Sequence, residues 1–252
     1  MFGKFRQRSY ELENLDRGSY TAEEYEGCIS ELQFVNEWLG DKWTLKRTLL
    51  RDVERSGLQK FSVLDVGAGS GELLRVAASW ARENGSQFYG VGLELNERSS
   101  KAINEESTAF REIVSVRADA RFLPFGAGEF DYVICSLFTH HFVELEIINI
   151  LREMSRVARR RIYVIDLHRH PVAYYFYTTI GKLFLHNRLL REDGALSILR
   201  SFRRRELREL AEQAELLNPK VAQYFPYRLV LSATANPSAT TVHQSAVTER
   251  AA

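Results

Sequence analysis

The 252-residue sequence has little cysteine, almost no net charge and no long apolar run. Its two cysteines, Cys28 and Cys135, stand far apart with no Cys or His at metal-ligand spacing, which argues against a disulfide framework and a structural zinc site. Lys and Arg total 34 against 33 Asp and Glu, so net charge gives no case for a nucleic-acid or membrane binder. Residues 1–10 lack a signal-peptide core and no run of about 18 apolar residues occurs, so we expect a cytoplasmic protein without a spanning helix.

The composition is that of an ordinary globular chain, with 45% hydrophobic and 27% charged residues. Its length exceeds the ~150 residues of a typical domain. We expect an N-terminal helical cap at 1–57, an α/β domain at 58–233 with an insertion at 168–202, and a tail at 234–252. The tail is rich in Ala, Ser and Thr without periodicity, so we expect it to be disordered.

The first 57 residues have the pattern of helices. Thr21 followed by Glu24 is a capping-box pattern. Apolar residues at helical spacing follow it: Tyr25, Cys28, Ile29, Leu32 and Val35. Gly40 ends that segment, and residues 43–55 form a second expected helix that stops near Gly57.

From Phe61 onward, short apolar segments alternate with helical ones. The expected strands are 61–66, 87–94, 113–117, 130–136 and 161–167, and the expected helices are 72–82, 97–106 and 144–157. This alternation predicts a parallel sheet with helices on both faces. A helix at 203–216 and two strands at 221–225 and 227–233, separated only by Pro226, predict an antiparallel hairpin at the sheet edge.

A glycine-rich turn follows the first strand, where open α/β sheets bind ligands. Gly67, Gly69 and Gly71 permit a tight turn and a close ligand, and the next helix offers N–H groups to an anion. A dinucleotide fingerprint would place its third glycine one residue later, where Glu72 stands, and that carboxylate would repel a pyrophosphate. Asp65, two residues before the first glycine, suits a ligand that carries an ammonium group.

Two further carboxylates follow the next strands. Glu94 ends the second strand, where it can hold both ribose hydroxyls of a nucleoside. Asp119 follows the third strand, where it can accept a hydrogen bond from an exocyclic amine, with Leu95 and Ala120 beside a flat ring. Structural alternatives remain open: a packing turn for the glycines, a place next to a helix N-cap for Glu94, and an Asx turn for Asp119.

Four segments in this order resemble class I S-adenosylmethionine-dependent methyltransferases. They are residues 63–71 (VLDVGAGSG), 92–95 (GLEL), 119–125 (DARFLPF) and 130–136 (FDYVICS), and the resemblance covers roughly 61–233. The sequence looks closest to the small-molecule branch with quinone-biosynthesis methyltransferases, where a strand ending in Ser is often followed by His-His-Phe, as between Ser136 and Phe142. The resemblance implies a Rossmann-like, doubly wound seven-stranded sheet with a reversed last strand, and S-adenosyl-L-methionine as cofactor.

The resemblance also implies roles for single residues. Asp65, Gly67, Gly69 and the Ser136 backbone would contact the methionine end of the cofactor. Glu94 would hold the ribose. The adenine would be contacted by Leu95, Asp119 and Ala120. Asp-Leu at the end of the fifth strand is similar to methyltransferases found with type III polyketide synthases, which suggests a phenolic or resorcinolic acceptor.

Four of the six histidines follow strand ends and should surround the transferred methyl group. His140 and His141 follow the fourth strand, and His168 and His170 follow the fifth. An imidazole suits the removal of a phenolic proton. We expect His140 or His141 to be the base or a substrate hydrogen-bond donor, with His168 as the second choice. A metal held by Asp166, His168 and His170 is a disfavoured alternative, and we predict no metal ligand.

The insertion carries dense aromatic residues at 174–177 and apolar residues at 183–185. These could wall a flat lipophilic acceptor, form an ordinary packed helix, or touch a membrane transiently without stable insertion. Candidate contacts from the cap are Tyr10, Tyr20, Tyr25 and Trp38. The arginines from Arg200 to Arg208 are interpreted as a solvated helix face rather than a nucleic-acid contact.

The sequence therefore predicts methyl transfer to a small-molecule acceptor that is aromatic or lipophilic, and not to nucleic acid. O-methylation of a phenolic or polyketide-like hydroxyl is preferred, with C-methylation of a quinone precursor as the alternative. Two other classes stay open: an NAD(P)-dependent oxidoreductase, disfavoured by Glu72 and the hairpin, and a non-catalytic nucleoside-binding partner of another enzyme.

Overall fold

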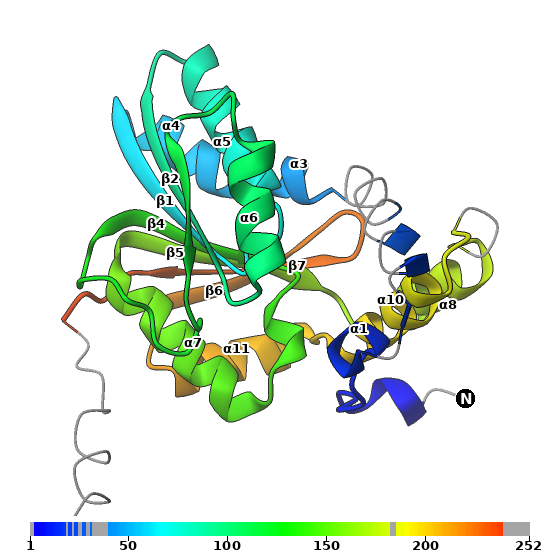
Figure 1. Cartoon of the computed structure of the whole chain (residues 1–252). Coiled ribbons are helices and arrows are strands. Elements are labelled where there is room, and N and C mark those ends of the chain that lie inside the picture. Colours follow the sequence, from blue (N-terminus) through cyan, green and yellow to red (C-terminus); the bar gives the residue numbers. More distant parts are fainter. Residues whose placement is uncertain are drawn as a thin grey trace, which may run out of the picture.

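The computed structural model describes residues 3–18, 20–21, 23–24, 27–28, 31, 40–181 and 185–238. A single seven-stranded sheet runs through its centre in the order β3-β2-β1-β4-β5-β7-β6 (Figure 1). The strands are β1 (Lys60–Val66), β2 (Gln87–Glu94), β3 (Ile113–Arg117), β4 (Phe130–Ser136), β5 (Ala158–Leu167), β6 (Leu217–Tyr224) and β7 (Arg228–Thr234). Strands β1 to β5 pair in parallel, and β7 is antiparallel to both β5 and β6. The predicted fold class is confirmed.

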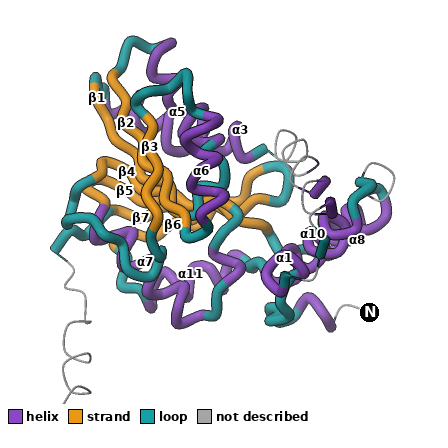
Figure 2. Tube along the Cα trace, viewed as in Figure 1, coloured by secondary structure: helices purple, strands orange, loops and turns teal. Residues whose placement is uncertain are grey.

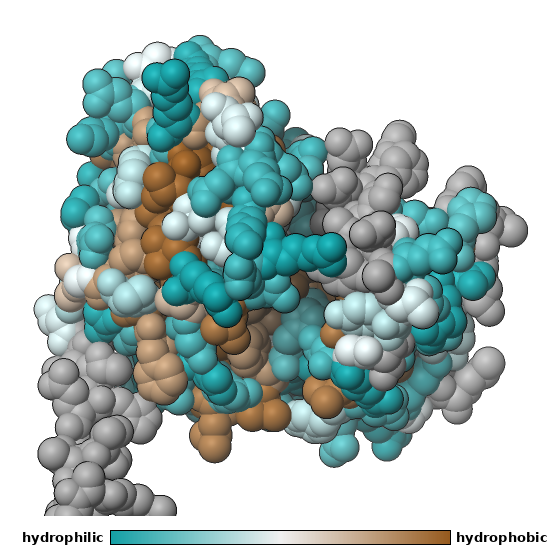
Figure 3. Space-filling view, in the orientation of Figure 1, coloured by the Kyte–Doolittle hydropathy of each residue, from teal (hydrophilic) through white to brown (hydrophobic). Residues whose placement is uncertain are grey.

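Helices cover both faces of this sheet (Figure 2). Apolar residues of α5 (Glu72–Glu83) and α6 (Glu97–Glu106) form one core against β1 and β4, and those of α7 (Glu144–Val157) and α11 (Arg204–Gln213) form another on the opposite face. The central strands are almost continuously apolar because both of their faces are covered. In the view of Figure 3, hydrophobic side chains gather in a band flanked by hydrophilic ones.

Most element boundaries lie where the sequence predicts them. The expected bounds of β2, β3, β4, α6 and α7 match the structure to the residue. Strand β5 begins three residues before the expected start, and β6 begins at Leu217 rather than Val221. The start of β6 was missed because Asn218 and Pro219 are typical turn residues; here they form an irregularity in the pairing with β7, and Asn218 has a φ of 51°.

Among its described residues, the N-terminal segment is less helical than the sequence predicts. It contains a 3-10 turn at Gly3–Phe5, one helical turn in α1 (Asn14–Arg17), and the consecutive helical stretch α3 (Asp41–Leu45), η2 (Lys46–Leu50) and α4 (Arg51–Ser56). Residues 8–13 are not helical, because they bond to distant parts of the chain; the Ser9 amide donates to the Leu199 carbonyl at 3.0 Å. The Thr21–Glu24 capping box is present, with bonds of 3.0 and 3.1 Å. The expected helical positions Tyr25, Ile29, Leu32 and Val35 lie outside the described residues.

Two helices after β5 stand beside the sheet. They are α8 (Pro171–Thr179) and α10 (Arg188–Arg200), which pack on each other, and α10 also contacts α1 (Figure 1). In the described residues, no helix is both long and apolar enough to cross a membrane. At the other end, packing continues past Ala233: the Ala235 amide bonds to Arg160 and the Asn236 amide to Ser155. The remainder of the expected disordered tail, 239–252, lies outside the described residues, as do Leu183 and Phe184.

Candidate active site

A cavity of about 880 Å³ lies at the carboxyl ends of β1, β4 and β5. Its wall is formed by the glycine loop, the segment after β4, helices α8 and α10, the β6–β7 turn, and Glu13 and Leu15 from the N-terminal segment. Open α/β sheets bind ligands at this edge. The volume is near the upper end of the usual range for a small-molecule site.

The glycine loop has one crowded and one open position. A Cβ at Gly67 would lie 2.3 Å from the Phe138 ring, and the residue has a φ of 73°, so only glycine fits. A Cβ at Gly69 would meet nothing within 4 Å, and its N–H donates to Glu94 Oε1 at 2.6 Å. Gly71 is the N-cap of α5 and does not line the cavity. The loop therefore places Gly69 and Glu94 together at an open edge.

Polar atoms without partners gather in this cavity. Of seven buried side-chain atoms without a hydrogen bond in the described residues, four belong to residues of the cavity wall: Asp65, Ser136, His168 and Arg228. Asp65 is 2% exposed, and burial together with nearby Glu94 raises its pKa to about 8. Because buried polar atoms in folded proteins are almost always bonded, this concentration indicates a site built for a polar ligand.

His140 is held rigidly by Asp166, the residue before the last of β5. The His140 ring is 3% exposed, and its Nδ1 lies 2.7 Å from Asp166 Oδ1. Burial alone would raise the pKa of Asp166, but His140, the Thr139 hydroxyl and the Leu167 amide outweigh it and hold that pKa at about 2. An ionised carboxylate at Nδ1 accepts the ring N–H, so the lone pair is left on Nε2.

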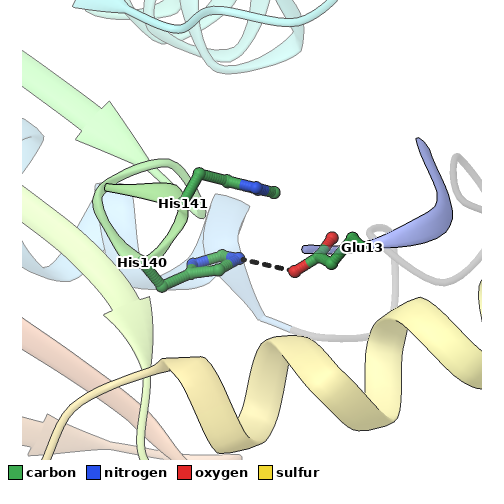
Figure 4. A group of neighbouring side chains, drawn as sticks. All are labelled: Glu13, His140 and His141. Atoms are coloured by element: carbon green, nitrogen blue, oxygen red, sulfur yellow. Dashed lines mark ion pairs between the residues drawn. The ribbon is translucent and has the colours of Figure 1, made fainter. Parts of the chain in front are cut away.

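His140 Nε2 faces a buried carboxyl group from the N-terminal segment. Glu13 Oε1 lies 3.9 Å from Nε2 and accepts a hydrogen bond from Ser197 at 2.8 Å, and burial raises the pKa of Glu13 (Figure 4). His141 lies beside the pair, with its own Nδ1 3.3 Å from Asp16. One ligand atom from each of Glu13, His140 and His141 falls within 4.8 Å of the others, and in the described chain this is the one such group of His, Cys, Asp or Glu. Sequence patterns gave no signal for Glu13.

Two buried arginines fix the backbone that carries the histidines. Arg200 is 4% exposed and donates to the carbonyls of His140 at 3.2 Å, His141 at 2.7 Å, and Glu11. Arg8 donates to the His140 carbonyl at 3.2 Å and to the Arg200 carbonyl at 2.7 Å. The interpretation of the arginine-rich stretch as a solvated face is therefore wrong for Arg200, because the carbonyls of a distant loop need its donors.

Replacing Arg200 by Met is expected to lower the free energy of unfolding by about 3 kcal/mol, since one buried and two partly buried carbonyls lose a charged donor. The measurement is urea denaturation followed by circular dichroism. Arg204→Met is the matched control, because Arg204 is exposed on α11 and should change stability by less than about 0.5 kcal/mol. Equal losses in the two variants would contradict this assignment.

The other histidines have different surroundings. His168 lines the cavity with an unpartnered Nδ1, and burial, His170, Arg169 and Arg203 together lower its pKa to about 4. His170 is not in the cavity wall; its Nδ1 accepts the Val172 amide and caps α8. The structure therefore does not bring Asp166, His168 and His170 into one ligand set.

The residues expected at the adenine end lie outside the cavity wall. Leu95 is 60% exposed and Ala120 is buried in a core. The Asp119 carboxylate is engaged by Arg121, with its shortest contact at 2.7 Å, and this lowers the Asp119 pKa. Their roles toward adenine stay predictions. Of the aromatic contacts expected from the cap, Tyr10 is exposed and bonds to Glu144, while Tyr25 and Trp38 lie outside the described residues.

Comparison with known proteins finds a family match in the middle of the chain and structures with a similar fold. Residues 64–165 match the family described as "Methyltransferase domain". A SAM-dependent methyltransferase from Aquifex aeolicus has a TM-score of 0.56 at 16% identity, over 79% of this chain and 96% of that one. Magnesium protoporphyrin IX methyltransferase from Synechocystis, crystallised with SAH, has a TM-score of 0.57 at 16% identity, over 81% and 88%. The DszA carbon methyltransferase gives 0.60 at 12%, over 79% and 54%. No curated protein matches.

The fold, the glycine loop and the family match over residues 64–165 together support an S-adenosylmethionine-dependent methyltransferase. The residues present fit this cofactor. Asp65 has a buried, unbonded carboxyl oxygen that would hold an ammonium group, Gly69 leaves open space in the loop, and Glu94 beside it would hold the ribose hydroxyls.

Cofactor binding should change the protonation of Asp65. With a pKa of about 8, Asp65 is mostly protonated at pH 7 without ligand, and a bound ammonium group favours the carboxylate. Binding of S-adenosylhomocysteine at pH 7 should therefore release about one proton, and fewer above pH 8. Calorimetry in two buffers of different ionisation enthalpy measures this number. Asp65→Asn should abolish the release, and a binding enthalpy independent of buffer in the unmodified protein would contradict it.

Proposed function

We propose that this methyltransferase transfers its methyl group to a hydroxyl oxygen of a lipophilic, phenol-bearing small molecule, with His140 as general base. The observation that carries the proposal is the buried Asp166–His140 pair, because His140 lines the same cavity as the glycine loop and directs its Nε2 toward Glu13, another residue of the cavity wall. When bound, S-adenosylmethionine supplies an electrophilic methyl group. His140 Nε2 would accept the hydroxyl proton as the oxygen is methylated, and Asp166 would stabilise the resulting imidazolium.

The cavity wall beyond the histidines is suited to an apolar acceptor. Its side chains come from the N-terminal segment, α8 and α10: Leu15, Cys28, Ala173, Phe176, Tyr177, Leu190 and Ile198. The Tyr177 hydroxyl is already bonded to the Leu190 carbonyl, and burial raises the pKa of Cys28 to about 11, so both present neutral surfaces. Asp193 in the same wall accepts the amides of Asn14 and Leu15. An alkyl or polyketide-like chain fits this lining.

A series of hydroxyaryl acceptors with increasing alkyl length tests the proposal. Each methylene that is buried should improve KM by about fourfold, until the chamber is filled. The product should carry a methoxy group, as read by NMR. A new methyl group on a ring carbon would instead establish C-methylation of a quinone-precursor type of acceptor. Turnover of chain-free acceptors alone, or of none of the series, would overturn the proposed acceptor class.

Treatment with a chelator tests whether His140 acts as a general base or whether His140 and His141 are metal ligands. The donor atoms of Glu13, His140 and His141 are close enough to approach one cation. With His140 as base, dialysis against EDTA should leave kcat unchanged. A loss of activity that is restored by one divalent metal would contradict the role given to His140.

A further inference from the structure

Arg228 is a buried cation with an unused hydrogen-bond donor in the cavity wall. It is the first residue of β7, pairs with Leu167 at the end of β5, and is 1% exposed. Its Nε donates to Asp41 Oδ1, but its Nη2 has no hydrogen-bond partner in the described part of the chain. An unsatisfied donor on a buried charged group costs more than the ~1–3 kcal/mol of a neutral one. A ligand that supplies an acceptor would offset this cost.

Helix α3 ties the Arg228 side chain to the glycine-loop side of the cavity. Asp41, its ion-pair partner, begins α3, and α3 packs on α5. The next residue, Lys42, forms an ion pair of 2.8 Å with Glu72, the first residue of α5. Since the glycine loop leads directly into Glu72, the guanidinium of a distant strand is anchored beside the loop that receives the cofactor.

The unused groups of this cavity have complementary charges. Asp65 contributes an unbonded carboxyl oxygen and Arg228 an unbonded guanidinium N–H, and both line the same cavity. A ligand that satisfies both carries an ammonium group and a carboxylate, which is the chemistry of an α-amino acid. A guanidinium is the side chain best shaped for a carboxylate. Within the cofactor, only the methionine end has this pair of groups.

We propose that Arg228 binds a carboxylate in this cavity, and that with Asp65 at the ammonium group it forms the subsite for the α-amino-acid end of the cofactor. Asp41 holds the guanidinium in place, as a positioning residue. Arg228 acts on the cofactor whichever acceptor is methylated, so this assignment and the proposed acceptor chemistry can fail separately. A carboxylate on the acceptor is the second possible source of the same chemistry.

The test is calorimetric titration of the full chain with two ligands. S-adenosylhomocysteine carries the amino-acid end, and 5′-methylthioadenosine is the same nucleoside thioether without it. Arg228→Lys keeps a charge for Asp41 but loses the guanidinium fork. The double variant Arg228→Met/Asp41→Asn leaves no unpaired buried charge, so it should fold. Arg161→Lys, on β5 outside the cavity wall, is the matched control.

Both Arg228 variants should bind S-adenosylhomocysteine about 10- to 100-fold more weakly, because a hydrogen bond to a charged group is lost. Their affinity for 5′-methylthioadenosine should stay within about twofold of that of the unmodified protein. If affinity for both ligands is unchanged but KM rises at least tenfold for carboxylated acceptors only, the carboxylate belongs to the acceptor. Equal losses for both ligands, or no change in either affinity or KM, would overturn the proposal.

Discussion

Replacing His140 by Asn is expected to lower kcat for a phenolic acceptor by about 10²- to 10⁴-fold, the usual worth of a positioned general base. Asn still offers an N–H to Asp166, so the buried carboxylate keeps a donor while the Nε2 lone pair is lost. Binding of S-adenosylhomocysteine should change by less than about threefold, because the ring is not assigned to the cofactor. Single-turnover kinetics at saturating cofactor measure the effect on the chemical step.

His170→Asn is the matched control for this variant. His170 caps α8 outside the cavity wall, and Asn is an equally good helix cap, so its kcat should stay near that of the unmodified protein. The loss in His140→Asn should also shrink for acceptors with more acidic hydroxyls, which ionise without a base. A loss below tenfold, or one that is the same for acidic and ordinary phenols, would show that catalysis rests on positioning and water exclusion.

Replacing Glu94 by Ala should weaken binding of S-adenosylhomocysteine by about 10- to 100-fold, since hydrogen bonds to a charged group contribute roughly 1.5–3 kcal/mol. This carboxylate accepts a hydrogen bond from the Gly69 amide at 2.6 Å, and burial raises its pKa. Two ribose hydroxyls are the donors that would take its place. The measurement is the dissociation constant by calorimetry.

Glu97→Ala provides the comparison for Glu94. Glu97 lies three residues later on α6, is exposed, and pairs with Lys101 and Arg117 rather than with the cavity wall. Its replacement should leave the dissociation constant within about twofold. If Glu94→Ala binds as tightly as Glu97→Ala, Glu94 has no part in the cofactor site.

Much of the fold could be predicted because its signals are local. Apolar runs bounded by turns predicted the bounds of β2, β3 and β4 to the residue. Helix α6 begins after Asn96, whose side chain is its N-cap. The start of β6 was missed where Asn218 and Pro219 interrupt the strand pattern. The N-terminal segment was predicted as helix because composition cannot show that residues 8–13 bond instead to α10 and to the loop after β4.

Only the part of the candidate site that lies at strand ends could be predicted from the sequence. The glycine loop, Asp65, Glu94 and Ser136 line one cavity because the carboxyl ends of parallel strands meet at one edge, and their roles toward the cofactor stay predictions. The choice between His140 and His141 needed the contact with Asp166, which lies 26 residues away in sequence. Glu13 and Arg200 reach the same histidine loop from the N-terminal segment and from α10, and no short-range pattern encodes such contacts.

Calorimetric titration with S-adenosylhomocysteine, beside a parallel titration with NADH, tests the cofactor assignment most directly. We expect saturable binding of S-adenosylhomocysteine to one site and no heat from NADH. Binding of NADH instead would show that the glycine loop binds a dinucleotide. Binding of neither ligand would contradict the assignment of this cavity to S-adenosylmethionine.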